Sequence, residues 1–203
     1  MSLQLPFEFL RPVRRTLWGM NSKPSYLGLL NAISLAETEA EGYLNCWAAT
    51  TKSDDVRAII ASVAIREGEH GKAFAKRISE LGFAVVPRGD SDEADAKMAI
   101  ASSTEMSDCE KFEKLKVGRQ SEPGTKDIFS SFFDDTSMDI QTGALMGRYV
   151  AEERDSGRML ATCYQQLQAA NQSHAASSPA LEGLAGQLGR IESLLEKLVS
   201  AQC

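Results

Sequence analysis

The chain has 203 residues, 43% of them hydrophobic, which suffices for the core of one domain, alone or with an appendage. Its formal net charge of −6 implies no basic face and argues against nucleic acid as the main partner. The four cysteines lack the CxxC spacing of a zinc site, and no apolar run reaches the length of a transmembrane segment. These features predict a cytoplasmic protein with free thiols.

Residues 1–23 form the first segment, in which apolar side chains are broken by Pro6 and Pro12 and followed by arginines. Prolines at this density exclude one continuous helix, because each fixes φ and removes a backbone donor. We expect an N-terminal arm that packs on the body of the protein or on a second subunit. An anchor on a membrane surface is the other interpretation, and the acidity of the chain disfavours it.

A first long helix is predicted from about residue 25 to residue 50, with apolar residues at helical spacing along one face. Glu37 interrupts this face, and a buried carboxylate is unfavourable unless it is paired or bound to a cation. Glu41 lies one turn further on and is a candidate supporting group. Tyr43 is close enough in sequence to be a hydrogen-bond partner or a radical trap.

A polar turn at residues 51–55 leads to a second long helix, which Gly82 ends in the position that glycine favours. The apolar face of this helix is interrupted only in its middle, by Glu67 and His70. Residues three apart on a helix lie about 60° apart around its axis, so both side chains can reach one metal ion. The short turn makes the two helices antiparallel and sets Glu37 and Glu67 within about 3 Å in height.

Residues 91–117 have a weaker helical pattern, and their serines and threonines predict two short helices instead of one. A third long helix is predicted from about residue 138 to residue 170. Glu153 interrupts its apolar face as carboxylates interrupt the first two, with Glu152 as the neighbouring candidate. Tyr149, one turn earlier, is a further candidate hydrogen-bond partner.

Residues 171–180 have the composition of a flexible linker. In residues 181–203, aliphatic side chains alternate at spacings of three and four, as along the seam of a coiled coil: Leu181, Leu184, Leu188, Ile191, Leu195 and Leu198. An isolated helix this short is marginally stable. We therefore expect homo-oligomerisation through this helix and the N-terminal arm, or docking of the helix on the body or on another partner.

The first-helix glutamate and the sequence Ala64–Phe74, AIREGEHGKAF, resemble the first half of rubrerythrin and other ferritin-like proteins. The sequence Gly147–Arg158 resembles the repeat of that motif in the second helix pair, so the resemblance covers roughly residues 25–170. It implies an all-α, ferritin-like antiparallel bundle over residues 24–170. To this bundle the pattern adds two features. The third-helix region, residues 91–117, is broken into two short helices, and the C-terminus forms a coiled-coil-like helix.

The resemblance also implies a ligand set, because these proteins bind a di-iron centre with a first-helix glutamate and Glu-x-x-His motifs. The matching residues here are Glu37, Glu67, His70 and Glu153. The implied cofactor is iron as a di-iron centre, although the same ligand types also suit manganese and zinc. A non-haem di-iron oxidoreductase that reacts with oxygen or peroxide is the activity that the resemblance implies, with an unidentified redox partner.

The second half departs from the family pattern. Ser156 stands three residues after Glu153, where the family has histidine, and counting from Glu152 instead places Asp155 there. Further ligands or supporting groups are therefore expected, with the last two in this list as candidates from the third-helix region: Glu152, Glu41, Tyr43, Tyr149, Glu105 and Asp108.

In a second interpretation, the protein has the helical-bundle fold but has lost the metal chemistry. Glu67 and His70 then form a buried polar network with Glu37, without a metal ion. The C-terminal helix carries the function instead, as a scaffold or adaptor. The metal content of the purified protein separates the two interpretations.

Overall fold

The computed structural model describes the backbone of residues 23–89, 91–118 and 127–200, with all their side chains except those of residues 174–186 and 191–200. Every element in these ranges is helical: α1 (Leu27–Thr50), α2 (Asp54–Glu80), α3 (Asp92–Ser102), α4 (Asp108–Leu115), the 3₁₀ helix η1 (Ile128–Ser131) and α5 (Ile140–Ser200). The all-α class is thus confirmed. None of these helices combines the length and apolar character needed to cross a membrane.

The α1–α2 hairpin is the centre of the fold, and its two helices make the most extensive helix–helix contact. Ser53 begins α2, because its hydroxyl accepts a hydrogen bond from the Val56 N–H at 3.3 Å. Gly82 ends α2 with a φ of +88°, and the Phe83 N–H donates to the Ile78 carbonyl at 3.1 Å. The antiparallel hairpin is therefore confirmed, as are the predicted start and end of α2.

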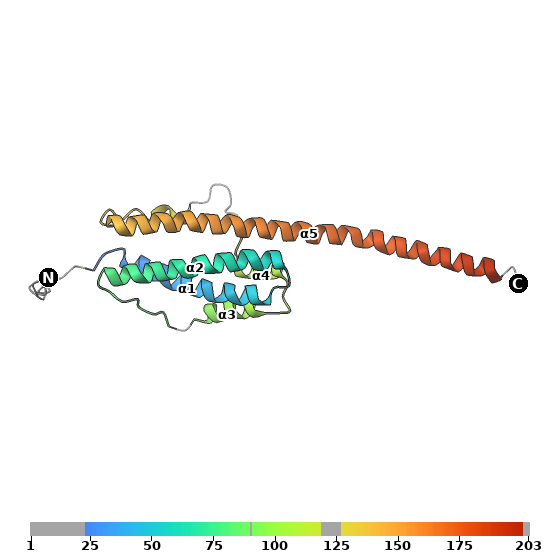
Figure 1. Ribbon diagram of the computed structural model, residues 1–203, viewed down its shortest axis with the longest axis horizontal. Helices are drawn as coiled ribbons and strands as arrows, with labels where there is room; N and C mark the ends of the chain where they lie inside the picture. Colours follow the sequence, from blue (N-terminus) through green and yellow to red (C-terminus); the bar gives the residue numbers. More distant parts are fainter. Residues whose placement is uncertain (1–22, 90, 119–126, 201–203) are drawn as a thin grey trace, which may run out of the picture.

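The remaining helices cover the hairpin from two sides. α3 packs on α1, whereas α5 packs on α2, and Figure 1 shows α3 and α5 on opposite sides of the hairpin. α4 contacts both α3 and α5. The third-helix region is thus two short helices, as predicted, and the capping box of Ser107 and Glu110 starts the second of them.

Helix α5 is longer than the sequence indicates, with 61 residues in one unbroken helix. The prediction of a flexible linker at residues 171–180 is wrong, because α5 passes through this segment and extends beyond the bundle (Figure 1). Alanine, the strongest helix former, is frequent there. The Ser173 hydroxyl also donates to the Ala169 carbonyl at 3.0 Å, so this polar side chain is satisfied within the helix.

The predicted coiled-coil seam lies on this extension. Leu188 is 59% exposed, as an unpaired seam residue should be, and the other five seam positions lie outside the described side chains. The N-terminal arm, residues 1–23, lies outside the described residues except for its last one. Homo-oligomerisation through these two segments therefore stays a prediction.

The buried apolar residues form two separate cores. The core near the α1–α2 turn includes Leu44, Trp47, Val56, Ile60, Val63, Phe112 and Leu160. The core at the open end of the hairpin includes Tyr26, Leu30, Ile33, Phe74, Ile78, Met146, Tyr149 and Val150. Along α1, α2 and α5 alike, the change from one core to the other falls at the glutamate that interrupts the apolar face.

Next to Glu37 and His70, the close approach of α1 and α2 depends on a glycine, Gly71. A Cβ atom added to Gly71 would lie 2.7 Å from the Thr38 hydroxyl and 3.2 Å from the Thr38 backbone nitrogen. We expect Gly71→Ala to lower the free energy of unfolding by about 1–3 kcal/mol, because the helices must move apart. Urea unfolding followed by circular dichroism measures the change.

The matched control is Gly143→Ala in α5, where an added Cβ atom meets nothing within 4 Å. This substitution should stabilise the protein by roughly 0.5–1 kcal/mol, since alanine restricts the unfolded chain more than glycine does. Equal stabilisation by both substitutions would contradict the close approach of the two helices.

Candidate metal centre

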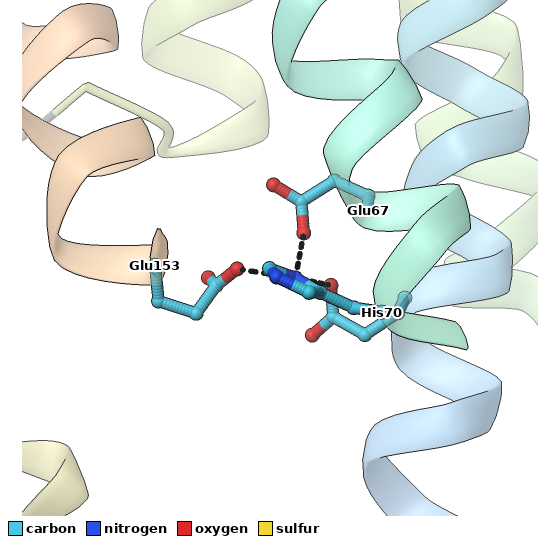
Figure 2. A group of neighbouring side chains, drawn as sticks. Glu67, His70 and Glu153 are labelled. Carbon is cyan, nitrogen blue, oxygen red and sulfur yellow. Dashed lines mark ion pairs between the residues drawn. The ribbon is translucent and has the colours of Figure 1, made fainter. Parts of the chain in front are cut away.

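Three helices bring four of the predicted ligands together between the two cores. Glu37 comes from α1, Glu67 and His70 from α2, and Glu153 from α5. One ligand atom from each residue lies within 4.8 Å of the others, so the group can hold a metal ion. Figure 2 shows Glu67, His70 and Glu153 pointing toward one another from α2 and α5.

The ring of His70 is the centre of this group. Its Nδ1 atom faces three carboxylates, at 3.2 Å from Glu153, 3.8 Å from Glu67 and 3.9 Å from Glu37. The Nε2 atom, on the other side of the ring, lies 2.8 Å from the Glu152 carboxylate. His70 is 4% exposed, so its orientation is fixed by these groups and not by solvent.

Two buried polar atoms of this group lack a hydrogen bond. They are His70 Nδ1 and Glu153 Oε1, and they face each other across 3.2 Å outside hydrogen-bond geometry. Buried polar atoms in folded proteins are almost always satisfied, so an unsatisfied pair calls for a partner such as an ion. A nitrogen and a carboxylate oxygen are both metal ligands, which makes a cation the fitting partner.

The size of the group also fits an ion. Two ligands of one ion lie at most about 4.2 Å apart when each metal–ligand bond is about 2.1 Å long. The observed span of 4.8 Å is slightly wider than this limit. A small inward movement of the carboxylates is therefore enough to bring all four residues onto one ion.

In the absence of an ion, protons supply the missing positive charge. Burial by itself would lower the pKa of His70, but the surrounding carboxylates of Glu153, Glu37, Glu67 and Glu152 outweigh it and raise the pKa to about 12. Burial raises the pKa of Glu67 to about 9, and the negative charges of Glu153 and Glu37 add to the rise. In the metal-free group, both shifts favour the protonated forms of His70 and Glu67.

Two predicted supporting residues contact the group directly. Glu152 accepts the hydrogen bond from His70 Nε2 and in turn receives one from Arg148 at 2.9 Å. Tyr149 donates to Glu37 Oε1 at 2.7 Å and lies with its ring edge against the imidazole of His70. Burial by itself would raise the pKa of Glu37, but the nearby His70 ring, the neighbouring Glu67 carboxyl and the hydrogen bond from Tyr149 outweigh it and lower the pKa.

Two further candidates lie near the group without joining it. Glu41 forms an ion pair with Lys72 at 3.2 Å, on the exposed side of the hairpin. Tyr43 lines a pocket with Glu37 and Glu67, and burial together with nearby carboxylates raises the pKa of its hydroxyl. Tyr43 is thus a neighbour of the group, as predicted, and Glu41 is not a ligand candidate in this arrangement.

The third-helix region supplies none of the four grouped residues. Asp108 accepts hydrogen bonds from Trp47 Nε1 at 2.7 Å and from the Thr51 hydroxyl at 2.6 Å, at the turn end of the hairpin. Glu105 is exposed, and its carboxylate accepts a hydrogen bond from the neighbouring Thr104 hydroxyl at 3.4 Å. Neither lies in the group, because the break between α3 and α4 carries this stretch away from it.

Ser156 and Asp155 stand where the ferritin-like motif has its second histidine, and both contact Arg66. Ser156 is 2% exposed and lies 3.1 Å from an Arg66 guanidinium nitrogen, which also contacts Asp155 at 3.1 Å. This nitrogen further donates to the Glu152 carbonyl at 3.2 Å. Sequence analysis missed Arg66, because only the packing of α2 on α5 shows which residues it meets.

Comparison of the chain with models of protein families, with curated proteins and with solved structures finds no significant match. The resemblance to ferritin-like proteins accordingly rests on the motifs themselves. The functional argument rests on the geometry of the four-residue group.

The raised pKa of Glu67 gives the metal-free protein a defined pH dependence. The pKa of the Glu67 carboxyl is 4.5 when unperturbed and about 9 in the folded protein, so the folded state holds the proton more tightly. The stability that this proton provides is present at low pH and is lost as the pH rises through this window. Glutamine cannot ionise, so the wild type should lose stability relative to Glu67→Gln from about pH 5 to about pH 9.

Urea unfolding with a chelator present, at several pH values for both proteins, measures this difference. A difference in unfolding free energy that does not vary with pH would show that the pKa of Glu67 is the same in the folded and unfolded states. This result would contradict the protonation of Glu67 that is assigned to the metal-free group.

Proposed function

We propose that the protein binds a divalent metal ion, iron(II), through Glu37, Glu67, His70 and Glu153 in a ferritin-like helical bundle. One observation carries the proposal: the buried His70 Nδ1 atom faces three carboxylates without a hydrogen bond. A buried cluster of carboxylates alone is a weak indication of a site. An imidazole nitrogen turned into the cluster and left without a hydrogen bond is an independent indication of a ligand.

The contact between His70 and Glu152 supports this assignment. A carboxylate can only accept at this distance, so Nε2 carries the hydrogen and Nδ1 of a neutral ring has a free lone pair. Metal-binding histidines commonly donate their second ring N–H to a carboxylate, which fixes the ring and raises its basicity. Glu152 is thus a positioning residue, as the exposed Arg148 is for Glu152.

The ligand types favour iron or manganese. The group offers three carboxylates and one imidazole and contains no cysteine, whereas thiolates and several imidazoles are typical of zinc and copper sites. Iron follows from the Glu-x-x-His resemblance, with manganese and zinc as the alternatives. Non-haem iron with an open position supplies one-electron chemistry with oxygen or peroxide, which is the activity proposed here.

The described residues suit one ion better than two. Dinuclear centres in helical bundles use four glutamates and two histidines. Here four residues converge, and the positions of the second histidine, Ser156 and Asp155, contact Arg66 instead. A positive guanidinium beside the second position disfavours another cation there.

The protein surroundings of the group have three tasks. Tyr149 holds Glu37 through one carboxylate oxygen and leaves the other free to face His70. Glu152 holds the imidazole. The two apolar cores on either side limit the access of water, which strengthens the charge interactions within the group.

Metal binding should raise the melting temperature. A ligand at a hundredfold excess over its Kd stabilises the folded state by roughly 3 kcal/mol, if it binds the folded state alone. We expect iron(II) without oxygen, or manganese(II), to shift the melting curve of chelator-treated protein upward. Elemental analysis of protein expressed with iron should find about one metal ion per chain, as four ligand residues imply.

The double variant Glu67→Ala with His70→Ala should abolish the shift. The matched control is Glu69→Ala, which removes an exposed carboxylate next to His70 and leaves the group intact. A melting curve indifferent to metal, together with no metal in the purified protein, would favour the alternative of a metal-free scaffold.

Removal of Glu152 should weaken binding without removing a ligand. Loss of the group that orients a metal-binding histidine lowers metal affinity by about 10- to 100-fold in known sites. Glu152→Ala should therefore raise the Kd for manganese(II), measured by electron paramagnetic resonance, by about this factor. Glu105→Ala, which removes an exposed carboxylate outside the group, should leave the Kd unchanged. Equal Kd values for both variants would show that Glu152 does not position His70.

A further inference from the structure

A pocket of about 350 Å³ opens onto one side of the four-residue group. Glu37, Glu67 and Glu153 all line it, and the first two are 6% exposed, so these carboxylates form its floor. The volume lies within the usual range for sites that bind small molecules, which begins at about 300 Å³. The metal ligands are therefore accessible from a chamber, and not enclosed in the core.

The walls of this pocket are mostly apolar. Side chains from α1, α2, α5 and the segment after α4 contribute to them: Ala36, Ala40, Leu44, Val63, Val117 and Leu160. Gly157 also lines the pocket, and a Cβ atom added there would meet nothing within 4 Å. Gly157 is exposed and carries no side chain, so the pocket is open on its α5 side.

Two cationic residues line the same pocket, and they differ in their partners. Lys97 forms ion pairs with Glu39 at 2.9 Å and with Glu93 at 3.2 Å. Arg88 is exposed and has no ion pair with any residue that the structure describes. Arg88 is therefore the cation available to a ligand, and its planar guanidinium matches a carboxylate.

The negative charge of the three carboxylates on the pocket floor determines the orientation in which a ligand binds. Three carboxylates outweigh the charge of one divalent ion, so the floor stays negative after the ion binds. An anionic group is repelled from the floor and attracted to Arg88. An apolar group meets the walls between them without such repulsion.

We propose that this pocket binds a small organic acid, with its carboxylate on Arg88 and its apolar body along the walls toward the metal ligands. The inference rests on the proposed function, since it names the class of substrate for the same site. An aromatic or short aliphatic acid of the size of benzoate fits the chamber. The assignment places the apolar end of the substrate, and not its carboxylate, next to the metal.

Calorimetric titration of the manganese(II)-loaded full chain with benzoate tests the proposal, with neutral benzyl alcohol as the comparison ligand. Benzoate should bind more tightly than benzyl alcohol. Arg88→Gln should raise the Kd for benzoate by about tenfold, the effect of losing a charged hydrogen bond. Arg190→Gln, which changes an exposed arginine on the α5 extension, is its matched control and should have no effect.

A second pair of variants tests the chamber itself. Gly157→Leu fills the open space and should abolish benzoate binding, whereas Gly147→Leu should not. Gly147 is a suitable control because it also lies in α5, and an added Cβ atom there likewise meets nothing within 4 Å. Manganese binding, followed by electron paramagnetic resonance, should be retained in all four variants and reports that each has folded.

The outcomes separate this inference from the proposed function. Absence of manganese binding in the wild type would overturn the proposed function. Manganese binding without benzoate binding would overturn the organic-acid pocket alone. Benzoate binding that is unchanged in Gly157→Leu, or unchanged in Arg88→Gln, would also overturn it, because the acid would then sit elsewhere or bind through the metal.

Discussion

The burial of Glu37, Glu67 and His70 between two apolar cores, with the partly exposed Glu153 beside them, is the constraint on which the rest of this structure depends. Each of α1, α2 and α5 carries one glutamate at the level where its apolar face changes cores. Such groups are unfavourable in an apolar interior unless a positive charge compensates them. Whether that charge is the protonated ring of His70 or a metal ion, the three helices must meet at this level.

The three helices fix the group with little freedom. Sites built on helices are held more closely than sites on loops, and here all four residues lie well inside their helices. Tyr149 links α5 to α1 through Glu37, and Glu152 links α5 to α2 through His70. α5 therefore both completes the group and orients two of its residues, Glu37 on α1 and His70 on α2.

The two sides of the His70 ring differ in character. On the Nδ1 side lie the three carboxylates and the apolar pocket with Arg88 at its edge. On the Nε2 side lies Glu152, which lines a second cavity of about 260 Å³ together with Arg148. A single buried ring thus separates the three carboxylates and their pocket from Glu152 and the second cavity. Arg66 contacts Asp155 and Ser156, which follow Glu153 on α5, so this part of α5 is joined to α2 as well.

Local sequence determined the helices and the level of the site. Apolar periodicity, Ser53 and Gly82 predict the hairpin, and counting residues from its turn places Glu37 beside Glu67. These features are local, so no knowledge of distant contacts is needed. The same periodicity placed Glu153 on the inner face of α5, which the structure confirms.

Only the tertiary structure decided which neighbours support the site and which candidates lie apart from it. Asp108 and Glu105 have suitable chemistry, but the break after α3 carries them away from the group. The contacts of Glu152 with His70, and of Arg66 with α5, depend on the rotation of α5 about its axis against α2. Composition predicted a linker at residues 171–180, where α5 continues as a helix. The physical reason is that a periodic pattern fixes which face of a helix is buried, whereas packing between distant segments fixes what that face meets.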